Sequence, residues 1–288
     1  MEATAQSAMS EIIYGWNSLL IAGFLLISMA AAIEGGYRMG RRQEASANKA
    51  TKDHIITIQG SMLGVLALLL AFSLSQALQR FDNRNAAVVD EANAIATTFL
   101  RTQLLPSSVR SDARKLLQSY VDLRVQASTI SLDKEADREV LLFDANQVLD
   151  ALWGCARRAA AEDPNPVTSG LFIQSLNEAI DAYGRRIAAV RRHVPEVILF
   201  LLFGTFVMTG GVLGYAAGVA GHRPSSVSYM LVGLIVVLAF VIIDLDRPRR
   251  GLIKVDQTSL IDVKAVIDQA QSAGAQPAVP ADGASPRR

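Results

Sequence analysis

The fold is decided by residues 54–106, which read HIITIQGSMLGVLALLLAFSLSQALQRFDNRNAAVVDEANAIATTFLRTQLLP. This stretch opens with twenty-five uncharged residues, Ile55 to Gln79, and then becomes charged without any helix breaker. No Gly or Pro occurs between Gly64 and Pro106, so the pattern predicts one helix of about 40 residues, about 60 Å long. The hydrocarbon core of a bilayer is only about 30 Å thick, so half of this helix must lie outside the membrane.

The whole chain has the composition of a membrane protein. Of its 288 residues, 51% are hydrophobic, and the mean hydropathy is +0.27, too apolar for a soluble domain of this size. Four uncharged runs are long enough to span a bilayer. They lie between Glu11 and Glu34, His54 and Arg80, Glu196 and His222, and Arg223 and Asp244. The first is expected to end at Glu34-Gly35-Gly36-Tyr37, because Gly suits a helix C-cap.

The one long segment between the spans predicts a helical bundle. Past the bilayer, the long helix keeps an apolar stripe at helical spacing, and further apolar helical patterns follow at about 109–127 and 134–161. Asp163-Pro164-Asn165-Pro166 breaks the chain, and Ser169 is expected to cap the next helix. Strand signals are absent from the sequence. The fold class is therefore all-α, an integral membrane protein with four transmembrane helices and an extramembrane bundle.

The predicted organisation has six segments. A disordered leader covers 1–10, and transmembrane helices 1 and 2 cover 11–79. The helical domain covers 80–195, the transmembrane hairpin of helices 3 and 4 covers 196–245, and a membrane-proximal segment covers 246–270. Residues 271–288 are rich in Ala, Gly, Pro and Ser, which cannot build a core, so a disordered tail is expected there.

Charge near the membrane favours one orientation. The side with the 80–195 domain and both termini carries ten basic residues, against six on the other side. The positive-inside rule therefore favours a cytoplasmic domain and cytoplasmic termini in the cell inner membrane. The short first loop is itself basic, however, and short loops weigh most in that rule, so both orientations stay open.

Several classes of function find no support. The net charge is +1 and no basic stripe with aromatics is present, which argues against nucleic acid as a partner. Cys155 is the single cysteine, and the three histidines are far apart, so no metal site or cofactor is predicted. Asp82, Asp90 and Glu91 lack a paired nucleophile or a phosphate-binding loop. An enzyme is therefore not expected.

The second span has two different faces when plotted at 100° per residue. Small residues that allow close helix packing gather on one face, namely Gly60, Gly64, Ala67 and Ala71. The opposite face grades from apolar to polar, with Leu66, Leu69, Ser73, Gln76 and Arg80. One interpretation makes this second face the lining of an ion pathway. In the other, Ser and Gln bond neighbouring helices and Arg80 reaches the headgroups.

The third span carries a second row of small residues. Gly210, Gly214 and Gly218 are spaced to pack closely against the second or fourth span. The fourth span closes with Asp244 and Asp246, which are followed at once by Arg247, Arg249 and Arg250. Local ion pairing at the membrane boundary is the preferred interpretation of these two carboxylates, with an ion site at this rim as the alternative.

The two charged boundaries resemble a known family. Residues 80–84 read RFDNR, 89–95 read VDEANAI, 99–106 read FLRTQLLP and 245–253 read LDRPRRGLI. These blocks are similar to those of the bacterial bestrophin-like family of unknown function, and the resemblance covers about residues 12–262. The motif positions that carry it are Phe81, Asp82, Arg84, Glu91, Asn93, Arg101, Pro106, Asp246, Arg247, Pro248 and Gly251.

The resemblance implies a homo-oligomeric membrane protein distantly related to bestrophin channels, which are pentamers with a pore lined by the second span. Small inorganic ions and the lipid bilayer would then be its partners. Two departures stand out: Phe72 is the only aromatic residue in this span, and Arg-Pro-Arg-Arg-Gly stands where those channels have an acidic calcium clasp. An ion channel is the leading hypothesis. The alternative is a non-conducting scaffold or sensor whose 80–195 domain binds a partner.

Overall fold

The computed structural model describes residues 18–130, 134–192, 194, 196–247 and 253–275. The described part is helical and contains no strand, so the all-α prediction is confirmed. Contacts divide the chain into two units. One holds the described residues of Met1–Arg84 and Ala189–Val255, and the other holds those of Asn85–Ala188 and Asp256–Arg288. Helix α3 passes from the first unit into the second.

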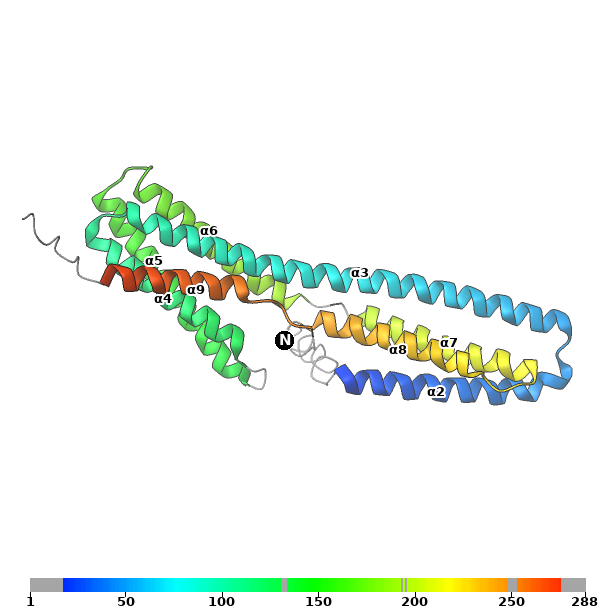
Figure 1. The fold of residues 1–288 in the computed structure, drawn as a ribbon. Helices are drawn as coiled ribbons and strands as arrows, with labels where there is room; N and C mark the ends of the chain where they lie inside the picture. Colours follow the sequence, from blue (N-terminus) through cyan, green and yellow to red (C-terminus); the bar gives the residue numbers. More distant parts are fainter. Residues whose placement is uncertain (1–17, 131–133, 193, 195, 248–252, 276–288) are drawn as a thin grey trace, which may run out of the picture. The chain divides into compact units, whose positions relative to one another are not determined.

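The first unit contains the apolar helices. They are α2 (Ser18–Gln43), α3 (Lys49–Arg101), α7 (Glu196–Ala220) and α8 (Ser226–Asp246), with a 3₁₀ turn at Glu44–Ser46 between α2 and α3. All four are long and apolar enough to cross a bilayer, which confirms the four predicted spans. Helix α3 has 53 residues and is about 80 Å long, longer than expected because it begins before His54. Helices α2, α7 and α8 run side by side (Figure 1).

Helix α2 does not stop where the sequence predicted. The expected end at Gly35-Gly36 is wrong, because the helix continues to Gln43. A Cβ atom at Gly36 would overlap the carbonyl oxygen of Gly211, and one at Gly40 would overlap that of Tyr215. Gly36 and Gly40 therefore serve close contact between two helices rather than a cap.

The glycines of α7 lie on the other side of the same contact. A Cβ at Gly214 would overlap the carbonyl of Ile33, one at Gly218 would overlap that of Tyr37, and one at Gly210 would lie 3.2 Å from the carbonyl of Met29. These glycines pack against the first span, α2, and not against the second or fourth as expected. Dispersion between closely approaching backbones is what holds helices together in lipid.

The second unit is a helical bundle. The extramembrane half of α3 ends in a 3₁₀ turn at Thr102–Leu104, and the remaining helices are α4 (Ser107–Thr129), α5 (Glu135–Glu162), α6 (Ser169–Arg191) and α9 (Thr258–Ala275). Ser169 is the first residue of α6 and not its cap; its hydroxyl bonds back to the carbonyl of Asp163.

Helix α9 belongs to this bundle through its contacts with α4. Gln118 Nε2 donates to Asp268 Oδ1 at 2.8 Å, and Gln271 Nε2 donates to the Arg114 carbonyl at 3.1 Å. Because α9 runs to Ala275, the expected start of the disordered tail at 271 is wrong. The leader at 1–10 and residues 276–288 lie outside the described residues.

The α2–α7 contact predicts the effect of adding a single methyl group. Gly214→Ala should destabilise the protein by about 1–3 kcal/mol, because backbone atoms of Ile33 would have to move. Gly204→Ala is the matched control on the same helix, since nothing lies within 4 Å of a Cβ there. Thermal denaturation in detergent, followed by size-exclusion chromatography, measures both. Equal Tm values for the two variants would contradict the close contact.

Candidate functional site: the exposed face of helix α3

One face of α3 packs inside its own subunit. Leu66, Leu70 and Ala77 are buried in a cluster with residues of α2, α7 and α8. An apolar hollow of about 500 Å³ separates part of α3 from α8, lined by Leu63, Leu66, Ala67, Leu70, Ala71, Leu74, Leu231, Leu234, Ile235, Leu238 and Ile242. Leu66 is only 2% exposed. This inward face is therefore committed to the subunit's own core.

The opposite face of α3 is exposed along the whole membrane segment. Its residues recur at helical spacing and form a stripe, which we call the outer stripe: Gly64, Leu68, Phe72, Ser75 and Gln79. Leu68 is 57% exposed and Phe72 is 63% exposed. Polar groups enter the stripe only towards the end of the span, at Ser75 and Gln79. The stripe is thus an apolar surface that becomes polar near the membrane boundary.

The residues that the sequence proposed for an ion pathway differ in how far the structure buries them. Leu66 is buried; Leu69, Ser73 and Arg80 are half-buried; Gln76 is exposed. Most of that set faces the subunit's own helices, and Arg80 lies 3.8 Å from Asp246 of α8. Since a buried side chain cannot line a shared pathway, the candidate lining moves to the outer stripe.

Among the described residues, no packing partner lies against Gly60 or Gly64, whereas Ala67 and Ala71 line the hollow beside α8. Gly60, Gly64, Ala67 and Ala71 are all exposed, and nothing lies within 4 Å of a Cβ built at Gly60 or Gly64. The predicted role of these four residues in helix packing therefore stays a prediction.

Arg84 fixes the orientation of α3 where the helix leaves the apolar region. Its guanidinium is buried and donates to the carbonyl oxygens of Ala189 at 3.3 Å, Leu245 at 3.0 Å, Arg192 at 2.9 Å and Asp246 at 3.1 Å. The last turns of α6 and α8 leave carbonyl groups without helical partners, and Arg84 satisfies them. One side chain thus ties α3 to the ends of two other helices.

Asp246 collects further contacts at this boundary. Its Oδ2 accepts from the backbone N–H of Val194 at 3.0 Å, and its Oδ1 lies 3.8 Å from Arg80 Nη1. Arg247 Nη1 donates to the Ser18 hydroxyl at 3.2 Å, and Asp244 Oδ2 accepts from the N–H of Ile253 at 3.0 Å. Asp246 thus lies near two arginines of α3, and the expected ion pairing of Asp244 and Asp246 with the arginines that follow them stays a prediction.

A second buried network holds the bundle unit together around Glu91. This carboxylate is fully buried, and it accepts from Arg124 Nε at 2.6 Å, Arg186 Nη1 at 2.6 Å and the Tyr120 hydroxyl at 2.9 Å. Arg186 Nη2 also donates to Gln257 Oε1 at 2.6 Å. The network therefore joins α3, α4, α6 and the segment that leads into α9.

The pKa values of the partners reflect their burial and the charge of Glu91. Burial raises the pKa of the Tyr120 hydroxyl well above its ordinary value, and Glu91 adds to the rise. Burial lowers the pKa of Arg186, which Glu91 offsets only in part. For Arg124 burial also acts to lower the pKa, but Glu91 outweighs it and the pKa is raised. Tyr120 therefore stays protonated and acts as a donor.

The family-motif residues divide between these networks and the surface. Four of them are buried and form the hydrogen bonds given above, namely Arg84, Glu91, Asp246 and Arg247. Phe81 is half-buried. The Nη1 of Arg101 donates to the Leu171 carbonyl at 2.7 Å. Asp82 and Asn93 are exposed, Pro106 precedes α4, and Pro248 and Gly251 lie outside the described residues.

Sequence reasoning missed Arg124 and Arg186 as partners of Glu91. Arg124 follows Leu117 and Tyr120 on the apolar face of α4, which was the available signal.

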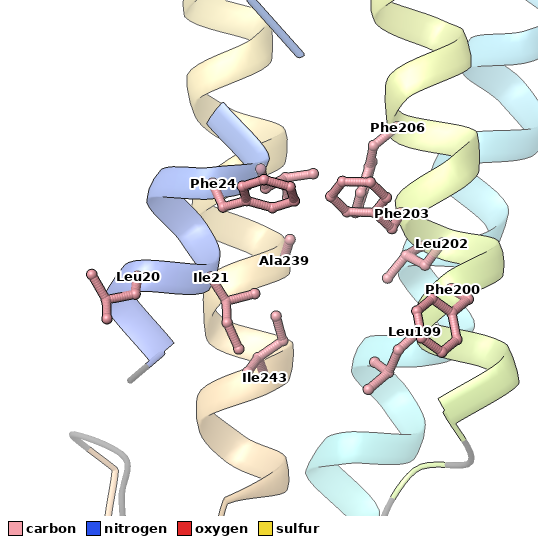
Figure 2. Close-up of a pocket in the computed structure, with 11 residues that line it drawn as sticks. Leu20, Ile21, Phe24, Leu199, Phe200, Leu202, Phe203, Phe206, Ala239 and Ile243 are labelled. Carbon is pink, nitrogen blue, oxygen red and sulfur yellow. The ribbon is translucent and has the colours of Figure 1, made fainter. Parts of the chain in front are cut away.

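The membrane unit also contains an apolar pocket of about 360 Å³ among α2, α7 and α8 (Figure 2). Its lining is Leu20, Ile21, Phe24, Leu25, Leu199, Phe200, Leu202, Phe203, Phe206, Ala239 and Ile243. The rings of Phe24 and Phe203 are nearly parallel with centroids 5.7 Å apart. No side chain of this lining can replace the water around an ion, so the pocket is not a candidate pathway.

The Glu91 network predicts a large effect of neutralising one carboxylate. Glu91→Gln should lower the free energy of unfolding by about 3–5 kcal/mol, because two buried guanidiniums lose their counter-charge. Asp90→Asn, one residue away on the exposed side, is the control and should change stability by less than about 0.5 kcal/mol. Tm values in detergent compare the two. A Glu91→Gln protein as stable as the control would contradict the role of the network.

Comparisons with known proteins agree with this architecture. Structures of point mutants of a bacterial bestrophin homologue from Klebsiella pneumoniae are similar at 15% identity and a TM-score of 0.66, covering 86% of this chain and 98% of that one. Another has 17% identity and a TM-score of 0.64, covering 90% and 99%. A crystal structure described as a membrane protein has 15% identity and a TM-score of 0.62, covering 88% and 100%. Among curated proteins, none matches this chain in sequence.

The family assignment rests on a match over most of the chain. The family model for the bestrophin-like domain matches residues 16–260, a range that contains all four spans, helices α4 to α6 of the bundle and the charged boundaries that carry Arg84 and Asp246. The chain therefore belongs to the bestrophin-like family.

Proposed function

We propose that this protein is a homo-oligomeric ion channel of the bacterial inner membrane in which the outer stripe of α3 lines the pathway. The observation that carries the proposal is the exposed row Gly64, Leu68, Phe72, Ser75 and Gln79, which points away from the subunit's own core. Membership of the family named after the bestrophin channels supports it. One subunit with four spans cannot enclose a pathway along α3, so the proposal requires several copies around a common axis.

The side chains of the outer stripe suit a pathway with a narrow apolar part and a hydrated, polar exit. Leu68 and Phe72 are large and apolar, and rings of such side chains close a pore to ions by excluding water. Ser75 and Gln79 offer hydroxyl and amide groups that can contact hydrated ions. The exposed residues on other spanning helices, such as Ile27 and Val237, are apolar, as expected for lipid contact.

The orientation that we propose puts the bundle unit and both termini in the cytoplasm. The excess of basic residues on that side of the membrane supports it. Ions leaving the apolar part of the pathway would then meet the polar residues of α3 on the cytoplasmic side.

The rival proposal is a non-conducting scaffold or sensor that binds a partner through the bundle. It rests on the apolar surface of α5, which exposes large side chains, with Val140 at 59% and Phe143 at 62% exposure. Exposed apolar groups of this size are common at protein interfaces. The same side chains would serve equally well at a contact between subunits of a channel, so they do not favour the scaffold over the channel.

Cysteine accessibility separates the outer stripe from the inward face. Cys155 is buried and is the only cysteine, so Cys155→Ala provides a cysteine-free background. In it, Ser75→Cys should react at least about tenfold faster with a charged, water-soluble thiol reagent than Ser73→Cys, because access controls the rate. Modification of Ser75→Cys should also reduce ion flux into liposomes. Ser73 is the matched control, two residues away on the half-buried side.

Three results would contradict the proposal. Faster reaction at Ser73→Cys would return the lining to the face that the sequence suggested. Purified protein that remains a monomer in detergent would exclude a shared pathway. Absence of flux for every small ion tested, with a stable oligomer, would favour the scaffold.

A further inference from the structure

The apolar pocket among α2, α7 and α8 has a buried floor and an exposed rim. Its floor is formed by side chains that are at most 5% exposed, namely Leu25, Leu202, Phe206 and Ala239. Its rim includes side chains that are at least 61% exposed, namely Leu20, Phe24 and Phe200. The pocket therefore opens to the outside of these three helices, where the hydrocarbon of the bilayer surrounds them.

The pocket lies within one leaflet, next to the boundary that carries Asp246. On α7, which begins at Glu196, the lining extends from Leu199 to Phe206, a length of about 10 Å along the helix. On α8 the lining ends at Ile243, about one turn before the helix ends at Asp246. The hydrocarbon of one leaflet is about 15 Å thick. The long axis of the pocket thus matches the direction and depth of a lipid acyl chain.

Aromatic rings line the end of the pocket that is farther from the boundary. Figure 2 shows Phe24, Phe203 and Phe206 at this end and Leu199 and Ile243 at the other. If its volume of about 360 Å³ were left empty within lipid, the wall atoms would lose dispersion contacts. An acyl chain that enters beside Ile243 and ends against the rings would restore these contacts without any change in the helices.

Two exposed arginines lie beside the end of α8, at the boundary end of the pocket. Arg84 Nη2 donates to the carbonyl of Arg192 at 2.9 Å, and its Nη1 donates to the carbonyl of Leu245 at 3.0 Å. The backbone of Arg192 is thereby held next to the last turn of α8. The side chains of Arg191 and Arg192 are exposed, and neither forms an ion pair with another of the described residues.

A third basic group lies at the same helix end, whereas the carboxylates there are covered. Lys254 is exposed and follows Ile253, whose N–H donates to Asp244 Oδ2 at 3.0 Å. Asp244 and Asp246 are both buried and accept hydrogen bonds from backbone amides. The exposed charge on this rim is therefore positive among the described residues of the membrane unit.

We propose that each subunit binds one anionic phospholipid, with an acyl chain in the pocket among α2, α7 and α8 and the phosphate against Arg191, Arg192 and Lys254. The apolar pocket fixes the position of the chain, and basic groups at the membrane surface attract an anionic headgroup. Lipid that merely surrounds the protein has no such pocket and no such set of charges. This site is independent of ion conduction, since it lies on other helices than the outer stripe of α3.

The test counts lipid molecules on the purified full-length protein by native mass spectrometry. The protein is washed with detergent to remove lipid and is then titrated with dioleoylphosphatidylglycerol, which is anionic, or with dioleoylphosphatidylcholine, which is zwitterionic. The wild type should bind one molecule of the anionic lipid per subunit. Its affinity for that lipid should exceed its affinity for the zwitterionic lipid by about tenfold or more, because three basic groups lie at the rim.

The contribution of the headgroup is tested by neutralising the two arginines. Arg191→Gln together with Arg192→Gln should lower the affinity for the anionic lipid by about tenfold or more and leave the affinity for the zwitterionic lipid unchanged. The matched control is Arg42→Gln together with Lys49→Gln, which removes two exposed basic groups at the opposite end of the spans. The control should bind the anionic lipid as the wild type does.

The contribution of the pocket is tested by filling it. Ala239→Leu should lower the affinity for both lipids by about fivefold or more, because the added carbons take the volume of the acyl chain. Val237→Leu is the control on the same helix, since Val237 is 57% exposed and does not line the pocket.

Three results would overturn the lipid site. The first is equal affinity of the wild type for the two lipids, and the second is unchanged binding of the anionic lipid after both arginines are neutralised. The third is a wild type that binds no lipid and an Ala239→Leu protein of altered oligomeric mass, since a second copy of the chain would then fill the pocket. If Ala239→Leu fails to fold, the arginine variant decides alone. No result depends on ion flux, so the channel is tested separately.

Discussion

A single guanidinium holds α3 in place where the helix leaves the apolar region. Arg84 is buried and donates to carbonyl groups of Ala189, Arg192, Leu245 and Asp246. These carbonyls lie at the ends of α6 and α8, where helical hydrogen bonds run out. A side chain bonded to so many fixed acceptors leaves α3 no freedom to turn about its own axis. The rotation of the helix, and with it the identity of its exposed face, follows from this contact.

Because the rotation of α3 is fixed, one face of the helix packs against its own subunit and the opposite face is exposed. Arg84 points the same way as Leu66, Leu70 and Ala77, so the apolar core and the basic groups share the inward side. The outer side keeps Leu68, Phe72, Ser75, Gln79 and Asp82. A face that is not used by its own subunit is available to a pathway shared among subunits. The proposed conduction follows from this division.

The sequence predicted the four spans, the helical bundle and the family, because long apolar runs and charged boundary motifs are local features. It did not predict which face of α3 is buried, since in lipid both the core and the exterior are apolar. Ser73 and Arg80 suggested a water-exposed face, yet both are half-buried on the inward side of α3. There Arg80 lies near Asp246 of α8, which is more than 160 residues away in the sequence. Gly35-Gly36 suggested a helix end, but Gly36 allows the close approach of α7. Such long-range partners leave no local signal.

The most direct test of the account is an experimental structure of the assembled protein in a lipid nanodisc, at a resolution that shows side chains. The account predicts several copies around one axis, with Leu68 and Phe72 from each α3 narrowing a central pathway and with Ser75 and Gln79 facing its exit. It would be contradicted by a monomer, or by an assembly in which the outer stripe of α3 faces lipid and Leu66 faces the axis.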